Sequence, residues 1–209
     1  MINFINKHNQ LNENRNSLNV SYIRNVNIIY GNYPFPEIIH KFIMDIKHNL
    51  DPKMENYTNV KGGMTDWEYF IDKPEFINFI KYLINKYQIT HPNIFEHFIQ
   101  KKNIMNAWGN EIKPGDSLDY HDHTCMHGIL YLTKGCNLLI PELNLEITPE
   151  PGDYYIFPPC ILHGFDKYQG EKNRYSLVFN IDDGNSFNYD KLKKMKEDKL
   201  KKKINEFNF

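Results

Sequence analysis

Two different spacings of hydrophobic residues divide the chain. In the first half, apolar residues recur every three to four positions, which is typical of amphipathic helices. One such stripe predicts a helix that begins at Pro36 and stops before Asp51. A second helix follows Asp72, which can cap its first turn, and a third is predicted at about residues 92–100. An edge strand is predicted at residues 26–30.

The spacing changes after residue 102. Short runs of β-type residues follow one another at roughly ten-residue intervals, and turns rich in Gly, Pro, Asn and Asp separate them. These runs are residues 104–112, 128–133, 137–140, 143–147, 154–157 and 175–181. Helices followed by regularly spaced antiparallel strands predict an α+β fold whose β part is a jelly roll or barrel.

The last segment is basic. Residues 191–203 contain eight lysines with apolar residues between them, a pattern that predicts an amphipathic helix with one basic face. We expect this face to be solvated, and a contact with RNA or a membrane is the alternative. At 209 residues the chain is predicted to form a single domain, because two smaller domains would each be short of core. Its parts are a mainly helical support at 1–102, a jelly-roll core at 103–184 and a basic C-terminal helix at 185–209.

Composition narrows the range of partners and compartments. The formal net charge of −1 gives no general reason to expect nucleic acid or an anionic membrane as a partner. No apolar run approaches the length of a transmembrane helix, and the N-terminal residues are too polar for a secretion signal. Three cysteines without a framework spacing favour reduced thiols. We therefore expect a cytoplasmic protein, of a source and oligomeric state that the sequence does not specify.

The stretch with the clearest chemistry is Tyr120-His121-Asp122-His123. Because side chains alternate along a strand, His121 and His123 point to one face and Asp122 points to the other. His163 follows a proline-rich turn later in the chain. Three neutral imidazoles suit Fe(II) or zinc and leave coordination positions open for other ligands. The sequence therefore predicts a metal site, and the remaining histidines, His127 among them, are expected to be ordinary surface or core residues.

A possible anion site follows on the last predicted strand. Arg174 and Ser176 are two positions apart, so both side chains lie on one face of that strand. A guanidinium group pairs with a carboxylate in bidentate fashion and stays charged when desolvated. The alternative is an exposed arginine at a strand start. Tyr131 and Asn106 are further pocket candidates, on strands that should flank the metal, with core packing as their alternative role.

These segments resemble the catalytic core of the 2-oxoglutarate/Fe(II)-dependent oxygenases. Residues 115–123 are similar to that superfamily's Gly-x-x-Leu-x-x-His-x-Asp segment, and residues 151–158 followed by His163 are similar to its second segment. Arg174-x-Ser176 is similar to the superfamily's co-substrate motif. Within the superfamily, the chain most closely resembles a subgroup of small, uncharacterised proteins with a His-x-His…His metal motif. The resemblance extends over roughly residues 59–66 and 104–183.

The resemblance implies a fold, a chemistry and a set of site residues. The fold would be a double-stranded β-helix of the jelly-roll, cupin-like type, flanked by N-terminal helices and a C-terminal helix. Fe(II) would be held by His121, His123 and His163, with no catalytic residue beyond these ligands. The reaction would be the O₂-dependent oxidative decarboxylation of 2-oxoglutarate, coupled to hydroxylation of an unidentified protein side chain or small metabolite. The family's co-substrate site would fall on Arg174 and Ser176, joined by Tyr131 and Asn106.

One position departs from the usual family pattern. His123 stands where most relatives place an aspartate, so the predicted site has no anionic protein ligand. A carboxylate from Asp119 or Asp122 would reach the metal only if the strand were bulged. Two alternatives account for three histidines: a cupin-type dioxygenase that needs no co-substrate, and a catalytically inactive module that binds zinc.

Overall fold

A computed structural model describes residues 2–5, 23–26, 28–55, 58–88, 104–135 and 137–181. The predicted third helix at 92–100 and the predicted basic helix at 185–209 lie outside these described residues. The predicted boundaries at 102/103 and 184/185 lie outside them as well, so the division of the chain into parts stays a prediction.

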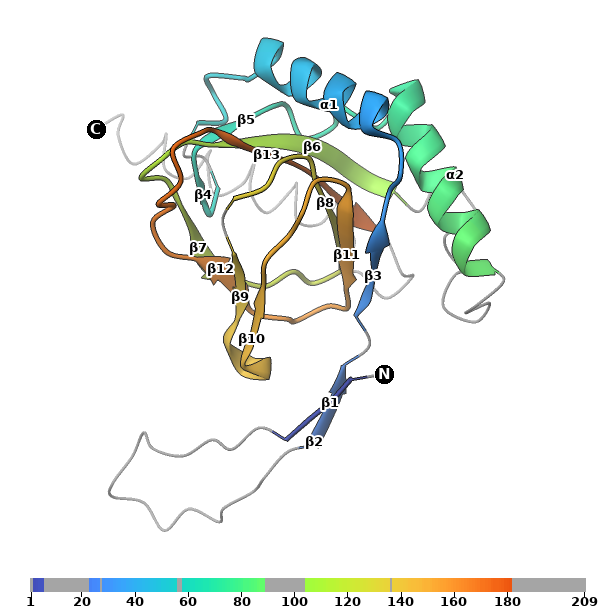
Figure 1. The fold of residues 1–209 in the computed structure, drawn as a ribbon, viewed down its shortest axis with the longest axis vertical. Coiled ribbons are helices and arrows are strands. Elements are labelled where there is room, and N and C mark those ends of the chain that lie inside the picture. The colour runs from blue at the N-terminus through green and yellow to red at the C-terminus, as the bar shows by residue number, and fades with distance from the viewer. Residues whose placement is uncertain are drawn as a thin grey trace, which may run out of the picture.

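Two of the three described antiparallel sheets form the barrel (Figure 1). The larger sheet has the order β3-β11-β8-β13-β6-β5 and the smaller sheet the order β10-β9-β12-β7-β4. The strands of the larger sheet are β3 (Ile29–Asn32), β5 (Gly63–Met64), β6 (Ile104–Ile112), β8 (Met126–Tyr131), β11 (Asp153–Phe157) and β13 (Arg174–Ile181). Those of the smaller sheet are β4 (Val60–Lys61), β7 (Ser117–His121), β9 (Leu138–Ile140), β10 (Leu145–Ile147) and β12 (His163–Phe165). This order of strands confirms the predicted double-stranded β-helix within an α+β fold.

Several predicted elements match the observed ones closely. The strand predicted at 104–112 is β6, and the strand predicted near residues 26–30 corresponds to β3, which pairs only with β11 at the edge of its sheet. A further pair, β1 (Ile2–Ile5) and β2 (Ile23–Val26), forms a separate two-stranded sheet. A short 3₁₀ turn, η3 (Pro141–Leu143), joins β9 to β10.

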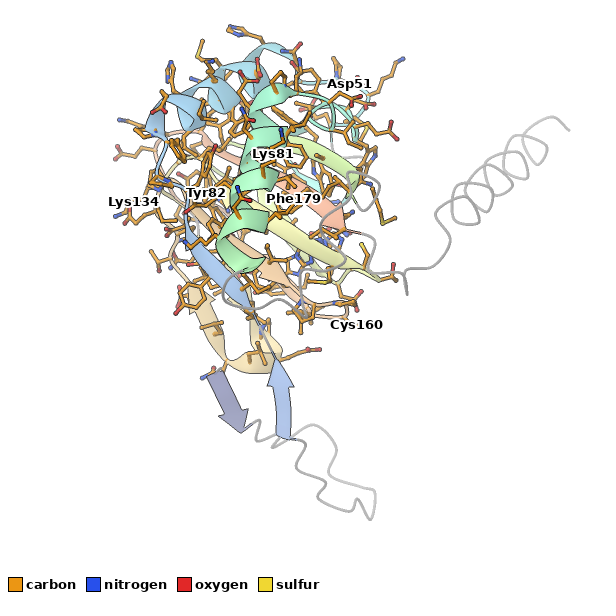
Figure 2. The ribbon with its side chains drawn as sticks, turned by 90° about the vertical axis from the view of Figure 1, so that its right-hand side faces the viewer. Asp51, Lys81, Tyr82, Lys134, Cys160 and Phe179 are labelled. Carbon is orange, nitrogen blue, oxygen red and sulfur yellow. The ribbon has the colours of Figure 1, made fainter. Side chains whose placement is uncertain are left out.

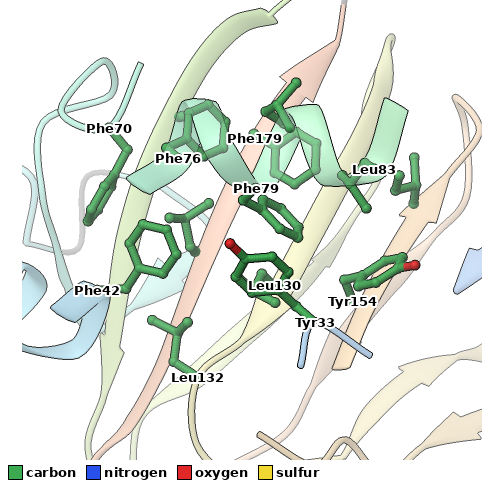
Figure 3. Packing of buried hydrophobic residues seen from close by; sticks show 14 of the residues in the cluster. Tyr33, Phe42, Phe70, Phe76, Phe79, Leu83, Leu130, Leu132, Tyr154 and Phe179 are labelled. Carbon is green, nitrogen blue, oxygen red and sulfur yellow. The ribbon is translucent and has the colours of Figure 1, made fainter. Parts of the chain in front are cut away.

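The two helices cover the outer face of the larger sheet. Helix α1 (Pro36–His48) and helix α2 (Pro74–Gln88) lie on the same side of the barrel, and the smaller sheet lies away from them (Figure 1). Phe76 and Phe79 of α2 pack with ring centroids 5.7 and 5.9 Å from that of Phe179 on β13 (Figure 3). Figure 2 shows α2 lying across the strands, with Phe179 beside it. No described helix is long and apolar enough to cross a membrane.

Alternation along β13 separates two hydrophobic cores. Leu177 and Phe179 belong to the core between the larger sheet and the helices. Val178 belongs to the core between the two sheets. Since successive side chains of a strand point to opposite faces, Arg174 and Ser176 lie on the same inward face as Val178. The strand that anchors the helices therefore also directs polar side chains into the barrel.

Gly109 allows α1 to lie close to β6. A Cβ atom at this position would overlap the side chain of Ile46, which is fully buried on α1. We predict that Gly109→Ala lowers the free energy of unfolding by about 1–3 kcal/mol, because the added methyl group forces the helix away from the sheet. Chemical denaturation of the variant and the wild type measures this difference.

The matched control is the same substitution in an Ile46→Ala background, where the atoms that clash are gone. There Gly109→Ala should destabilise much less, which gives a favourable coupling energy in the double-mutant cycle. Equal destabilisation in both backgrounds would contradict the proposed steric cause.

Candidate metal centre and its cavity

Three histidines converge between the ends of two strands of the smaller sheet. His121 ends β7, His123 follows it by two residues, and His163 begins β12. His121 and His163 are register partners across the β7–β12 pair. Each of the three residues offers a ligand atom, and these atoms all lie within 4.8 Å of one another. The structure therefore brings together the three histidines that the sequence predicted as ligands.

Backbone carbonyl groups orient two of these rings. Nδ1 of His121 lies 2.8 Å from the carbonyl oxygen of Asp119, and Nδ1 of His163 lies 2.8 Å from that of Ile161. A carbonyl oxygen only accepts, so each Nδ1 carries the proton and donates it. The lone pair is then on Nε2 in both rings, which is the arrangement that second-sphere hydrogen bonds commonly impose on metal-ligating histidines.

The loops that carry the histidines are tied to each other. The backbone N–H of Cys160 donates a 2.8 Å hydrogen bond to the carbonyl oxygen of His123. Cys160 adopts a left-handed backbone conformation with φ of 62°. This bond joins the turn before His163 to the turn after His121, so the three ligand atoms are held together by backbone contacts as well as by the sheet.

Burial keeps the histidines neutral. It lowers the pKa of His123 to about 3, with the neighbouring rings of His121 and His163 acting in the same direction. It also lowers the pKa of His163 to about 4 and lowers that of His121. Near neutral pH all three imidazoles are therefore unprotonated, which is the form that binds a metal ion.

No carboxylate joins the ligand cluster of the described residues, although the strand pairing is irregular as a bulge would require. The β7–β12 pairing does shift register, because His163 opposes His121 whereas Phe165 opposes Leu118. Even so, Asp119 lies 3.2 Å from Lys61 in a surface ion pair, and Asp122 is exposed. Within the described ranges, the ligand cluster contains the three histidines and no carboxylate.

The histidines share a cavity with the predicted anion site. The cavity has a volume of about 440 Å³, and its lining includes all three histidines together with Tyr131, Arg174 and Ser176. Arg174 is only 3% exposed. The central carbon of its guanidinium group lies 4.9 Å from the ring centroid of Tyr131 and 5.1 Å from that of Phe165. The predicted alternative of an exposed arginine is therefore wrong.

Among the described residues, no carboxylate pairs with this buried arginine. Its Nε has no hydrogen-bond partner, and in the part of the chain that the structure describes no carboxylate lies within ion-pair distance of it. A buried charge is unfavourable unless it is paired. The cavity is therefore suited to an anionic ligand at its Arg174 end.

Two asparagines lie on the inward face of β6, at different positions along the strand. Asn110 is a register partner of Ser176, which also pairs with Tyr131, and all three line the cavity. Asn106 lies four residues further along β6 and is not part of the cavity lining. The predicted role of Asn106 in binding 2-oxoglutarate stays a prediction, and Asn110 is the asparagine at the level of Ser176.

Sequence reasoning missed a fourth histidine beside the cluster. His127 is 1% exposed and lines the cavity. Its ring stacks on those of His123, His163 and Phe157 at centroid distances of 4.2, 4.6 and 5.0 Å. Burial lowers its pKa well below the ordinary value. The available signal was its place on β8, where alternation puts it on the same face as Ile129 and Tyr131.

No protein-family model matches the sequence, and no curated protein matches it significantly. Solved structures do share its fold. A collagen prolyl hydroxylase of Paramecium bursaria Chlorella virus 1, solved with 2-oxoglutarate, is 15% identical, and the match covers 74% of this chain and 94% of that protein with a TM-score of 0.54. A prolyl-4-hydroxylase of Pseudomonas putida is 13% identical over 74% and 91% of the two chains, with a TM-score of 0.55.

HygX from Streptomyces hygroscopicus, solved with nickel and 2-oxoglutarate, is a third example. It is 10% identical over 74% of this chain and 82% of its own, with a TM-score of 0.51. The resemblance to the 2-oxoglutarate/Fe(II) oxygenases that the sequence motifs indicated is thus confirmed at the level of the fold. At these identities the likeness is one of fold alone, so the activity has to be argued from this chain's own site.

Because Arg174 is buried and unpaired, we predict that Arg174→Met stabilises the ligand-free protein by about 1–4 kcal/mol. Methionine keeps contact with the rings of Tyr131 and Phe165 and removes the uncompensated charge. Thermal unfolding in the absence of ligands measures the effect as a rise in Tm. Lys61→Met serves as the control, since it removes an exposed cation and should change stability by no more than about 0.5 kcal/mol. A lower Tm for Arg174→Met would contradict this account.

Proposed function

We propose that the protein is an Fe(II)- and 2-oxoglutarate-dependent dioxygenase that hydroxylates a protein side chain or a small metabolite. The observation that carries the proposal is that one cavity contains two complementary features. Three neutral imidazoles converge at one end of it, and at the other lies a buried arginine that pairs with no carboxylate of the described residues. Either feature alone is compatible with several functions, whereas together they match a metal ion and an acidic co-substrate.

The residues present fit an iron site. His121 and His163 direct Nε2 into the cluster, and His123 supplies the third ligand atom. Imidazole is a good ligand for Fe(II), and a three-residue set leaves positions open for further ligands. When bound, the metal would supply the oxygen chemistry that amino-acid side chains cannot perform.

The opposite end of the cavity fits the far carboxylate of 2-oxoglutarate. Arg174 offers a bidentate partner for that group, and the hydroxyl of Ser176 can donate to it from the same face of β13. The rings of Tyr131 and Phe165 both lie against the guanidinium and help to exclude water from it. The work of these residues is to bind and orient the co-substrate in the cavity.

Charge balance supports a dianion in particular. The lining contains four neutral imidazoles, those of the three candidate ligands and of His127, together with one guanidinium cation and the exposed carboxylate of Asp122 at the metal end. A divalent metal would leave the cavity with a net positive charge. A dicarboxylate that reaches both ends would neutralise the metal and the arginine together. Because His123 replaces the carboxylate ligand that most relatives have, this site depends on the co-substrate for neutralisation more than usual.

The proposal predicts succinate formation that requires both ends of the cavity. Wild-type protein supplied with Fe(II), 2-oxoglutarate and O₂ should release succinate above the protein-free background. His163→Ala should abolish the reaction, because two imidazoles no longer hold the metal. Release of succinate is measured by chromatography, and bound iron by elemental analysis. Equal succinate release by the His163→Ala variant would contradict the proposal.

Arg174→Met separates co-substrate binding from metal binding. The variant should bind metal as the wild type does, whereas the 2-oxoglutarate concentration needed for half-maximal rate should rise by about 30-fold or more, since a buried charge pair typically contributes 2–5 kcal/mol. The Lys61→Met variant should behave as the wild type does. An unchanged requirement for 2-oxoglutarate in Arg174→Met would show that Arg174 is not the anchor.

One observation favours a second candidate function. The described ligand cluster holds three histidines and no carboxylate, which also suits a cupin-type dioxygenase that needs no co-substrate. That reading leaves the buried Arg174 unexplained. Oxygen uptake on small thiols without 2-oxoglutarate would favour it, whereas stoichiometric zinc with no affinity for 2-oxoglutarate would indicate an inactive metal-binding module.

A further inference from the structure

Among the described residues that line the cavity, Asp122 alone carries a carboxylate. Strand alternation predicted that its side chain would point away from those of His121 and His123. Strand β7 ends at His121, however, so Asp122 lies in the turn that follows, where the alternation no longer applies. The residue is exposed. It therefore places a negative charge at the metal end of the cavity, on the side that faces solvent.

This carboxylate is neither a member of the ligand cluster nor part of an ion pair. Asp122 does not belong to the group of converging ligand atoms. Among the described residues, no histidine, lysine or arginine pairs with it. Asp119, two residues before His121, differs because it lies 3.2 Å from Lys61. Of the two carboxylates that flank His121 in the sequence, one is thus neutralised by a neighbouring cation and the other is available to an ion in the cavity.

The charge of Asp122 acts on the ligand rings. Burial lowers the pKa of His121 and of His163, and the negative charge of Asp122 acts on both in the opposite direction. At His121 the effect of Asp122 is larger than that of the Asp119 charge. A field that favours a proton on these rings also favours a metal ion between them. The effect is about twice as large for a divalent ion, because the energy is proportional to the charge.

The formal charges of the cavity give Asp122 a role that the co-substrate does not fill. In the proposed function, a divalent metal, Arg174 and dianionic 2-oxoglutarate together carry one positive charge in excess, and Asp122 brings the total to zero. The co-substrate is consumed in each turnover, whereas Asp122 stays. When no co-substrate is bound, Asp122 is the negative charge of the described cavity lining that remains beside the metal.

We propose that Asp122 is a counter-charge for the metal, a carboxylate that does not coordinate the ion but stabilises it from the mouth of the cavity. It compensates for the anionic ligand that the set of three histidines lacks. The inference deepens the proposed function and rests on it only for the identity of the metal, because any divalent ion held by the three histidines meets the same charge. The work of Asp122 is to retain the ion between turnovers.

A titration with Co(II) measures affinity and coordination together, since the visible absorption of this ion depends on its ligands and their geometry. The full-length, metal-free protein is titrated without 2-oxoglutarate at about 10 mM and at about 1 M salt, where the Debye lengths are about 30 and 3 Å. At low salt, Asp122→Asn should weaken Co(II) binding about five- to tenfold, the effect of one charge in water at roughly 6–8 Å from a divalent ion. At high salt the difference should fall below about twofold, and the absorption spectrum should match that of the wild type throughout.

Two further variants make the test quantitative. Asp122→Lys changes the charge by two units, so its effect at low salt should be about the square of that of Asp122→Asn. Asp119→Asn is the matched control, because Lys61 already neutralises that carboxylate, and it should weaken binding by less than about twofold. Since Asp122 is exposed, metal-free Asp122→Asn should have the Tm of the wild type, which separates an effect on the metal from one on folding.

The results separate this proposal from the proposed function. The counter-charge is overturned if Asp122→Asn binds Co(II) as the wild type does at low salt, or if Asp119→Asn has an equal effect. It is also overturned if the weakening persists at high salt with a changed absorption spectrum, since Asp122 would then be a ligand. Wild-type protein that binds no Co(II) would contradict both proposals. Co(II) binding that depends on Asp122, without succinate formation by the iron-loaded protein, would contradict the proposed function alone.

Discussion

The pairing of β13 with both β6 and β8 is the constraint on which the rest of the structure depends. All eight residues of β13 are buried, and the two-residue period of a strand sends them alternately to the helices and to the cavity. Phe179 contacts α2 from one face, while Arg174 and Ser176 enter the cavity from the other. A slip of one residue would place Arg174 beneath the helices and Phe179 beside the histidines. The same hydrogen-bonded register therefore determines the packing of the helices and the composition of the site.

The metal-binding geometry depends mainly on the backbone. The protons on Nδ1 of His121 and His163 are held by carbonyl groups two residues earlier in each case, and the Cys160–His123 bond joins the two ligand loops. Backbone groups are present whatever the neighbouring side chains are, so this orientation does not require particular residues at Asp119 or Ile161. It does require the bulged β7–β12 pairing, because that pairing brings His121 opposite His163.

Much of the fold and of the metal cluster could be predicted because the signals are local. The extent of β6 follows from a β-type run that a Pro-Gly turn closes, and the joint direction of His121 and His123 follows from strand periodicity. The placement of Asn106, His127 and Asn180 side by side could not be predicted, because they come from three strands whose register is set by non-local pairing. His127 in particular has neighbours from β11 and β12, namely Phe157 and His163, that lie far from it in sequence. Asn106 was predicted to be a pocket residue because its strand should flank the metal. Its position along that strand relative to the metal depends on the register of the strand pairing.

Buried polar atoms without hydrogen-bond partners are distributed unequally between the two faces of the larger sheet, and this difference distinguishes residues that stabilise the fold from residues that serve binding. Both faces of the larger sheet are buried, and they share the same strands and the same register. On the helix side the core is formed by well-packed aromatic and aliphatic residues. Among the described residues, several buried side chains have a nitrogen or oxygen atom without a hydrogen-bond partner, and they lie on the inward face: Asn106, Trp108, Asn110, His127, Arg174 and Asn180. Since each of them destabilises the free protein, and apolar residues serve the same strands on the other face, stability does not account for them. Binding accounts for those that line the cavity, Trp108, Asn110, His127 and Arg174. A ligand that supplies the missing partners turns each of these groups from a destabilising one into a source of affinity and specificity.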